Sequence, residues 1–275
     1  MCNVNKELKK LAKEAERYAK KICTCGENCY AKDLPPLVFP PLDTQRVIFI
    51  SEAPYNFPRK CIKNSGDFIT KELPVELSYY IFKCPMPYTE GNWNIFRFIY
   101  EAFHPLFENC TCGEEATLKF LKHVYWTHMA KKSLKGISKN GAISKCLEKF
   151  SQEFNCIYEK RGSGIKLFIV CTSYFYNKFT KYPKWKRIIV QQFKILKTKD
   201  RLLKINDILV PSKPNRKVNS SIRECIEVLK QFEDCHIAFF PNPSKANIKR
   251  IREFFTEKHV NKLLNKIYGI LQSIQ

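Results

Sequence analysis

The residues best suited to chemistry stand in two short polar runs, each directly after an apolar run typical of a β-strand. Ser51-Glu52-Ala53-Pro54-Tyr55 follows residues 46–50, and Pro241-Asn242-Pro243-Ser244 follows residues 236–240. Glu52 has the chemistry of a base or of a group that orients water, and Asn242 can donate a hydrogen bond. Ligands of open α/β sheets bind where parallel strands end. The two runs therefore predict two walls of one cleft.

Two further strand-like runs end in polar residues. Residues 123–126 and 165–170 are rich in β-branched and aromatic side chains. Thr127-His128 and Cys171-Thr172 follow them, and His128 adds another hydrogen-bonding group. The one glycine-rich candidate, Arg161-Gly162-Ser163-Gly164, precedes a strand, whereas phosphate-binding loops follow one. We therefore do not expect a dinucleotide enzyme.

Helical periodicity separates the predicted strands. It is found at residues 4–22, 94–104, 114–122, 142–160 and 219–232. The alternation predicts an α/β fold: a three-layer α/β/α domain around a central, mainly parallel four-stranded sheet. Residues 55–92, with their prolines, glycines and aromatics, are expected to form loops over the mouth of the site. The region 185–214 is ambiguous, with strands near 188–195 and 205–210, and the tail from residue 244 reads as one broken helix or two.

One domain is expected at 31–275, preceded at 1–30 by a helix and a cysteine cluster. Lys and Arg outnumber Asp and Glu by 48 to 26, which gives a formal charge of +22. Such an excess favours a polyanion as partner, with DNA, single- or double-stranded, in first place. The alternative is that lysine enrichment reflects genome composition or a hot habitat. Without a spanning apolar run or a secretory leader, we expect a cytoplasmic monomer with no membrane partner.

Four segments resemble motifs of the uracil-DNA glycosylase superfamily and follow one another in the order found in that family. The resemblance is greatest to the iron–sulfur branch and its relatives. Residues 51–55 resemble the first motif, where a strand runs into a Gly-Glu-Ala-Pro type of loop. Residues 125–132 resemble the second strand and its exit, and 142–147 resemble the helix that supplies a late cluster cysteine. Residues 241–244 resemble the His-Pro-Ser loop. The resemblance extends from about residue 23 to 256.

The resemblance implies a base-excision enzyme that hydrolyses the N-glycosidic bond of uracil or another deaminated base flipped out of DNA. Glu52 would orient water and stabilise the cationic sugar, and Asn242 would donate a hydrogen bond to the departing base. Members of the family usually have a histidine at the position that Asn242 occupies in this chain. In the iron–sulfur branch an asparagine stands where this chain has His128, and that asparagine reads the uracil edge.

Further base-binding residues follow from the same resemblance. Ser51 and Ala53 would belong to the base pocket, and Tyr55 would lie against the pyrimidine 5-position, where it would exclude thymine. The aromatic ring that stacks on the base is either Phe68 or one of the pair Tyr80 and Phe82. The DNA backbone would meet the helix start that carries Ser244, Lys245 and Lys249.

Thirteen cysteines in an intracellular chain favour metal ligands or buried small residues over disulfides. The resemblance implies a 4Fe-4S cluster, with Cys23, Cys25, Cys29 and Cys146 as candidate ligands. The position of the third cluster ligand in the iron–sulfur branch corresponds to Lys132 in this chain, and lysine cannot bind iron. Either Cys23 supplies the missing thiolate, zinc replaces the cluster, or no metal is bound. Cys110 and Cys112 are a spare pair.

Two other functions remain open at this point. The chain could be a non-catalytic nucleic-acid-binding or complex-forming member of the same fold, as the differences at His128 and Asn242 would allow. Alternatively, it could be an interaction protein held together by a metal, with its positive charge directed at RNA or an acidic partner.

Overall fold

A central parallel sheet organises the computed structural model, which describes residues 2–22, 36–54, 61–83, 94–131, 139–161, 164–172, 196–197, 220–232, 235–241 and 257–273. Four strands run parallel: β1 (Val47–Ser51), β2 (Val124–His128), β3 (Leu167–Thr172) and β5 (His236–Pro241). The short β4 (Leu196–Lys197) pairs antiparallel with β5. The order across the sheet is β2-β1-β3-β5-β4. The predicted four-stranded, mainly parallel sheet is therefore confirmed.

The strands extend slightly further than their composition suggests. Thr127 and His128 belong to β2, and Cys171 and Thr172 belong to β3, rather than following these strands. Ladder pairing decides the ends, because Ser51 is in register with His128. The ladder continues one step beyond, where Met129 N–H donates to the Ser51 carbonyl over 2.9 Å and Ala130 N–H donates to the Glu52 carbonyl over 2.8 Å.

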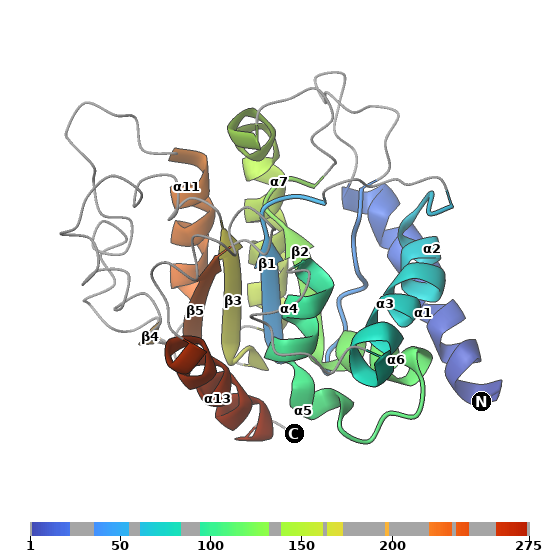
Figure 1. Ribbon diagram of the computed structural model, residues 1–275. Coiled ribbons are helices and arrows are strands. Elements are labelled where there is room, and N and C mark those ends of the chain that lie inside the picture. Colours follow the sequence, from blue (N-terminus) through green and yellow to red (C-terminus); the bar gives the residue numbers. More distant parts are fainter. Residues whose placement is uncertain are drawn as a thin grey trace.

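Helices cover both faces of the sheet (Figure 1). On one face Phe49 of β1 packs against Phe98 of α4 (Ile95–Ala102), with ring centroids 5.6 Å apart. On the other face Phe168 of β3 packs against Phe154 of α7 (Lys139–Arg161) over 6.3 Å. Phe168 is in register with Ile48, the neighbour of Phe49, so the two rings point to opposite faces. The three-layer α/β/α prediction is confirmed.

Further helices complete each layer. Helix α11 (Ser220–Val228) packs against α7 and continues into the 3₁₀ turn η5 (Leu229–Gln231). Helix α13 (Glu257–Ser273) packs against α4 and α5 (His104–Phe107). Of the other predicted segments, 188–195 and 205–210 lie outside the described residues, as does the start of the tail from residue 244. Within the part of the chain that is described, no helix has the length and apolar character needed to cross a membrane.

A helical group lies on the β2 side of the sheet (Figure 1). It contains α1 (Cys2–Ile22), α2 (Ser65–Asp67), the π-helical turn η1 (Phe68–Glu72), α3 (Leu73–Ser78), the π-helical turn η2 (Tyr79–Lys83) and α6 (Gly113–His123). Helix α1 packs against α2, η1 and α6. Leu8, Leu11 and Ala15 of α1 are buried in the same core as the sheet.

The expectation of loops at residues 55–92 is wrong for 61–83, which are mostly helical. Asn64 caps the start, its side-chain oxygen accepting from Asp67 N–H over 2.8 Å. Ile69, Leu73 and Leu77 then follow at helical spacing and are fully buried. Pro74 stands in the first turn of α3, where its missing N–H costs little. The helical spacing of the apolar residues outweighed the loop-like composition.

Candidate functional site

Ser51, Trp126 and His128 form a hydrogen-bonded chain at the ends of β1 and β2. Trp126 Nε1–H donates to Ser51 Oγ over 3.0 Å, and Ser51 Oγ lies 2.7 Å from His128 Nδ1. All three side chains are buried on the α4 face of the sheet, the face to which Phe49 points. Alternation along the strands places them there, because Phe49 is in register with Trp126 and Ser51 with His128. The predicted pocket residues Ser51 and His128 are thus brought together.

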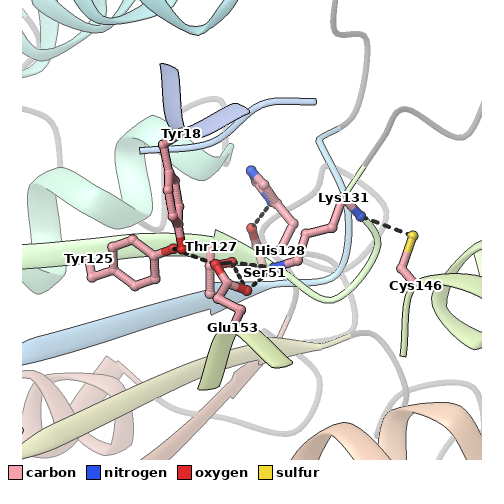
Figure 2. A network of polar contacts seen from close by, with 8 residues as sticks. All are labelled: Tyr18, Ser51, Tyr125, Thr127, His128, Lys131, Cys146 and Glu153. Carbon is pink, nitrogen blue, oxygen red and sulfur yellow. Dashed lines mark hydrogen bonds and ion pairs between the residues drawn. The ribbon is translucent and has the colours of Figure 1, made fainter. Parts of the chain in front are cut away.

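His128 is held in its neutral form. Burial, followed by the nearby positive charge of Lys131, lowers the pKa of His128 to about 3 from its usual 6.5. Only 2% of the residue is exposed. Its second ring nitrogen, Nε2, is buried and has no hydrogen-bond partner among the described residues. In Figure 2 this nitrogen points away from Ser51 and from Glu153.

The lowered pKa predicts a loss of stability in mild acid. Folded protein keeps His128 neutral down to about pH 3, while the unfolded chain binds a proton below pH 6.5. Between about pH 6.5 and pH 3 the unfolded state therefore binds more protons than the folded state. The stabilising contribution of neutral His128 to the free energy of unfolding is complete above pH 6.5 and decreases as the pH falls below it. Lowering the pH from 6.5 to about 5 should cost roughly 2 kcal/mol through this group. Urea unfolding at both pH values should show that extra loss in wild type and not in His128→Gln; equal losses would contradict the prediction.

Glu52 is fully buried one residue beyond β1. Burial, and after it the negative charge of Glu52, raises the pKa of the Cys171 thiol well above its usual value. Cys171 of β3 therefore lies near Glu52 and remains a thiol, which makes it a poor nucleophile. Ala53 is also buried. The ends of β1, β2 and β3 thus gather a carboxyl group, a neutral imidazole and a thiol.

A second polar network lies on the opposite face of β2 (Figure 2). Lys131 Nζ forms an ion pair with Glu153 of α7 and donates to Thr127 Oγ1 over 2.7 Å. Thr127 Oγ1 donates to Glu153 Oε1 over 3.0 Å, and Tyr125 O–H also donates to Glu153. Tyr125 O–H is 3.3 Å from the hydroxyl oxygen of Tyr18 on α1. Burial, and after it the Glu153 carboxylate, raises the pKa of Tyr125 well above its usual value.

The candidate stacking rings lie in different surroundings. Phe68 is 4% exposed and packs edge-on against Trp126 and Phe39, with ring centroids 5.9 Å away in each case. Tyr80 is buried, and its hydroxyl oxygen accepts from Asn94 Nδ2 over 2.7 Å. Phe82 is 49% exposed. Phe68 thus contacts Trp126, but it packs as a core residue does. The choice of stacking residue stays a prediction.

The remaining candidates lie outside the described residues. These are Tyr55, Asn242, the backbone-binding set and three of the four cysteines, namely Ser244, Lys245, Lys249, Cys23, Cys25 and Cys29. Chain connectivity still places Tyr55 directly after Pro54. It likewise places Asn242 directly after Pro241, the last residue of β5. Pro241 is in register with Thr172, the last residue of β3.

Cys146, the fourth candidate metal ligand, is buried on α7. Its sulfur accepts from Lys131 N–H over 3.4 Å, a contact of the kind that also suits a thiolate ligand. The described residues contain no group of three or more His, Cys, Asp or Glu side chains that could hold a metal. The metal site stays a prediction, because its other proposed ligands are not among those residues.

Sequence reasoning missed the roles of Trp126, Lys131 and Glu153. The role of Glu153 could have been inferred from the sequence, because Glu153 lies between Phe150 and Phe154 in the stretch of α7 that faces the core. A charged residue in such a place needs a buried partner. Trp126 had a weaker signal, since it shares strand parity with His128. Finding its partner also required the register between β1 and β2.

No family model, no curated protein and no solved structure matches the chain. The functional argument therefore depends on the geometry at the strand ends and on the chemistry of the residues there.

Proposed function

We propose that the protein is a DNA glycosylase that hydrolyses the N-glycosidic bond of uracil or another deaminated base. The observation that carries the proposal is the common end of β1 and β2. There the fully buried Glu52 follows a strand whose last residue, Ser51, is hydrogen-bonded to the neutral His128. A carboxyl group and an uncharged hydrogen-bonding ring at the same end of the sheet suit a reaction in which a cationic sugar and an anionic base develop together.

Glu52 has the roles of orienting water and stabilising positive charge. Cleavage of the N-glycosidic bond leaves an oxocarbenium-like sugar, and the attacking water must approach that carbon. A carboxylate at low exposure interacts strongly with such a cation, because little water screens it. Glu52 is 0% exposed. On this proposal, its surroundings open when a flipped nucleotide enters.

The departing base needs hydrogen-bond donors at its oxygens. Asn242, the first residue after β5, would supply one from its side-chain amide. His128 would supply another from its ring while staying uncharged. A neutral donor suits the leaving base, because it can stabilise the developing negative charge without first forming a buried ion pair in the ground state.

Binding to DNA is supported by the overall charge. The formal net charge is +22, and Lys245 and Lys249 follow Asn242 within a few residues. Phosphate contacts from lysine are independent of sequence and weaken as salt is added. We propose that Ser244 and these lysines bind the backbone on either side of the extruded nucleotide, so that the strand end of β5 contributes to both binding and chemistry.

The direct test is a strand-cleavage assay. Oligonucleotides with one uracil, hypoxanthine or xanthine are incubated with the protein and then cleaved by alkali at any abasic site. Wild type should release at least one of these bases. Asn242→Ala should slow release by about 10²–10³-fold, the usual effect of losing one preorganised donor. DNA that is bound without release of any base would favour the non-catalytic alternative and contradict the proposal.

A further inference from the structure

Helix α1 presents a continuous row of basic side chains to solvent. On its inner side Leu8, Leu11 and Ala15 are buried in the core. The outer side carries seven exposed basic residues, which form the α1 stripe: Lys6, Lys9, Lys10, Lys13, Arg17, Lys20 and Lys21. At 3.6 residues per turn these seven lie within roughly a third of the helix circumference, opposite the buried side.

Acidic residues of α1 offset little of this charge. Among the described side chains of the helix, Glu16 is the one exposed acidic residue. Glu7 forms an ion pair with Lys122 of α6 over 2.8 Å, so its charge is shared with a lysine outside the stripe. Glu14 lies 4.0 Å from Lys10, which is itself 76% exposed. The α1 stripe therefore keeps a strong net positive charge.

Lysine enrichment of the whole chain does not explain the stripe. Helix α7 is of similar length, 23 residues against 21, and also has one buried and one exposed side. Its exposed charged residues among those described are Lys145, Glu148, Glu159 and Lys160, so the two signs are balanced. A chain-wide excess of lysine would raise both helices alike. The positive charge is instead concentrated on α1.

The shape of the stripe suits a linear polyanion. Lys6 and Lys20 are separated by 14 residues, which is about 21 Å along the helix axis, and basic residues recur at nearly every turn, about 5 Å apart. Nucleic-acid backbones present negative charges in a similarly regular line. Protein interfaces favour aromatic residues and methionine and are poor in lysine. The exposed residues of α1, as far as they are described, include neither an aromatic ring nor a methionine.

A membrane surface fits the helix less well. Amphipathic helices bind membranes by inserting an apolar side at the lipid boundary. The apolar side of α1 is already packed in the core of the protein, through Leu8, Leu11 and Ala15. The stripe could therefore reach a membrane only through its charge.

The stripe leads to the edge of the sheet where the parallel strands end. Figure 1 shows α1 running beside the helical group from the N-terminus to the level of that edge. Near its C-terminal end, the Tyr18 hydroxyl oxygen is 3.3 Å from Tyr125 O–H of β2. Lys20 and Lys21 follow Tyr18 directly, on the last turn of the helix.

We propose that the α1 stripe binds the phosphate backbone of DNA that extends beyond the strand ends. It is a second backbone contact, separate from Ser244, Lys245 and Lys249. The inference rests on the function proposed above for DNA as the polyanion. Because the stripe contacts phosphates and no base, its contribution is independent of sequence and of damage.

The test compares two charge-matched double variants in binding to an undamaged DNA duplex over a range of salt concentrations. Lys13→Gln with Arg17→Gln removes two charges from the stripe, and Lys149→Gln with Lys160→Gln removes two from α7. The α1 variant should lose about tenfold in affinity at low salt, and its plot of log affinity against log salt should become shallower by about 1.5–2. The α7 variant should keep the wild-type slope and stay within about threefold in affinity.

The salt slope excludes a folding defect. Glutamine is a good helix former, so α1 should keep its structure. A misfolded fraction would reduce the amount of protein able to bind and would leave the slope unchanged. The same loss should be found with a duplex that carries one 2′-fluorinated uracil nucleotide, which resists hydrolysis because fluorine destabilises the cationic sugar.

Each outcome decides the proposal separately from catalysis. A loss confined to the α1 variant supports the stripe as a DNA contact, even if no base is released from any substrate. Equal losses in both variants would assign the effect to overall charge, and no loss in either would leave the stripe without a role in DNA binding; each result overturns the inference even if uracil is released. Vesicles rich in anionic lipid are the last arm. If the α1 variant lost binding to vesicles but not to DNA, the partner would be a membrane and the inference would be wrong.

Discussion

Lys131→Met should destabilise the protein by roughly 3–5 kcal/mol, the cost of leaving one charge of a buried ion pair without its partner. Lys131 and Glu153 are only 1% and 5% exposed, and their ion pair lies between the end of β2 and α7. After the substitution the Glu153 carboxylate keeps the hydroxyls of Thr127 and Tyr125 as donors. These hydrogen bonds offset part of the loss but do not neutralise the charge. Chemical denaturation measures the free energy of unfolding directly.

A double substitution distinguishes the ion pair from simple loss of packing. In Lys131→Met combined with Glu153→Gln no buried charge remains, so this variant should be clearly more stable than the sum of the two single effects predicts. Lys10→Met is the control, because Lys10 belongs to an ion pair with Glu14 on the surface of α1, 4.0 Å long and 76% exposed at the lysine. That substitution should change stability by less than about 1 kcal/mol. Additive effects at Lys131 and Glu153 would contradict the prediction.

The four parallel strands could be predicted from the sequence because each is a short run of β-branched and aromatic residues. All five residues of β1 and all five of β2 are buried, as expected for strands between two helical layers. The helices at 61–83 were harder to recognise. Their apolar residues have helical spacing, but the surrounding Pro, Gly and aromatic residues are equally common in loops, and their burial against α1 depends on tertiary packing.

The candidate site was predictable in its residues and not in its contacts. Polar residues after apolar runs drew attention to Ser51, Glu52 and His128, because parallel strands end at one edge of the sheet. The Ser51–His128 hydrogen bond, however, depends on the register of β1 against β2. A shift of one residue would place Thr127 opposite Ser51 and turn His128 to the other face of the sheet. Composition does not determine that register, since both strands are uniformly apolar up to their last residues.

Lys131 connects the two sides of β2. On the α7 face it pairs with Glu153, while its charge contributes, after burial, to the low pKa of His128 on the α4 face. The lysine that lowers the pKa of His128 is thus held by a residue of α7, behind the sheet from the proposed base pocket. The Trp126 chain fixes the imidazole from one side of the strand, and the Lys131–Glu153 pair fixes the strand from the other.

Glu52→Gln should abolish most of the catalytic activity and leave DNA binding in place. The substitution keeps the size of the side chain, which matters because Glu52 is fully buried and a smaller residue would leave a cavity. An amide cannot accept a proton from water or offset a cationic sugar, so single-turnover release of uracil should slow by about 10²–10⁴-fold. Affinity for uncleavable uracil DNA should change by no more than about twofold, because the lost interaction belongs to the transition state.

The matched control for Glu52 is Glu72→Gln. Glu72 is also a buried carboxyl residue, 8% exposed, but it lies on η1 rather than at the end of a strand of the sheet. Its substitution should leave the rate of base release unchanged even if it lowers stability. If both variants slowed release equally, the effect would reflect general loss of a buried carboxyl group. If Glu52→Gln kept the wild-type rate, Glu52 would not be the group that orients water, and the carboxylate chemistry at the end of β1 would have to be abandoned.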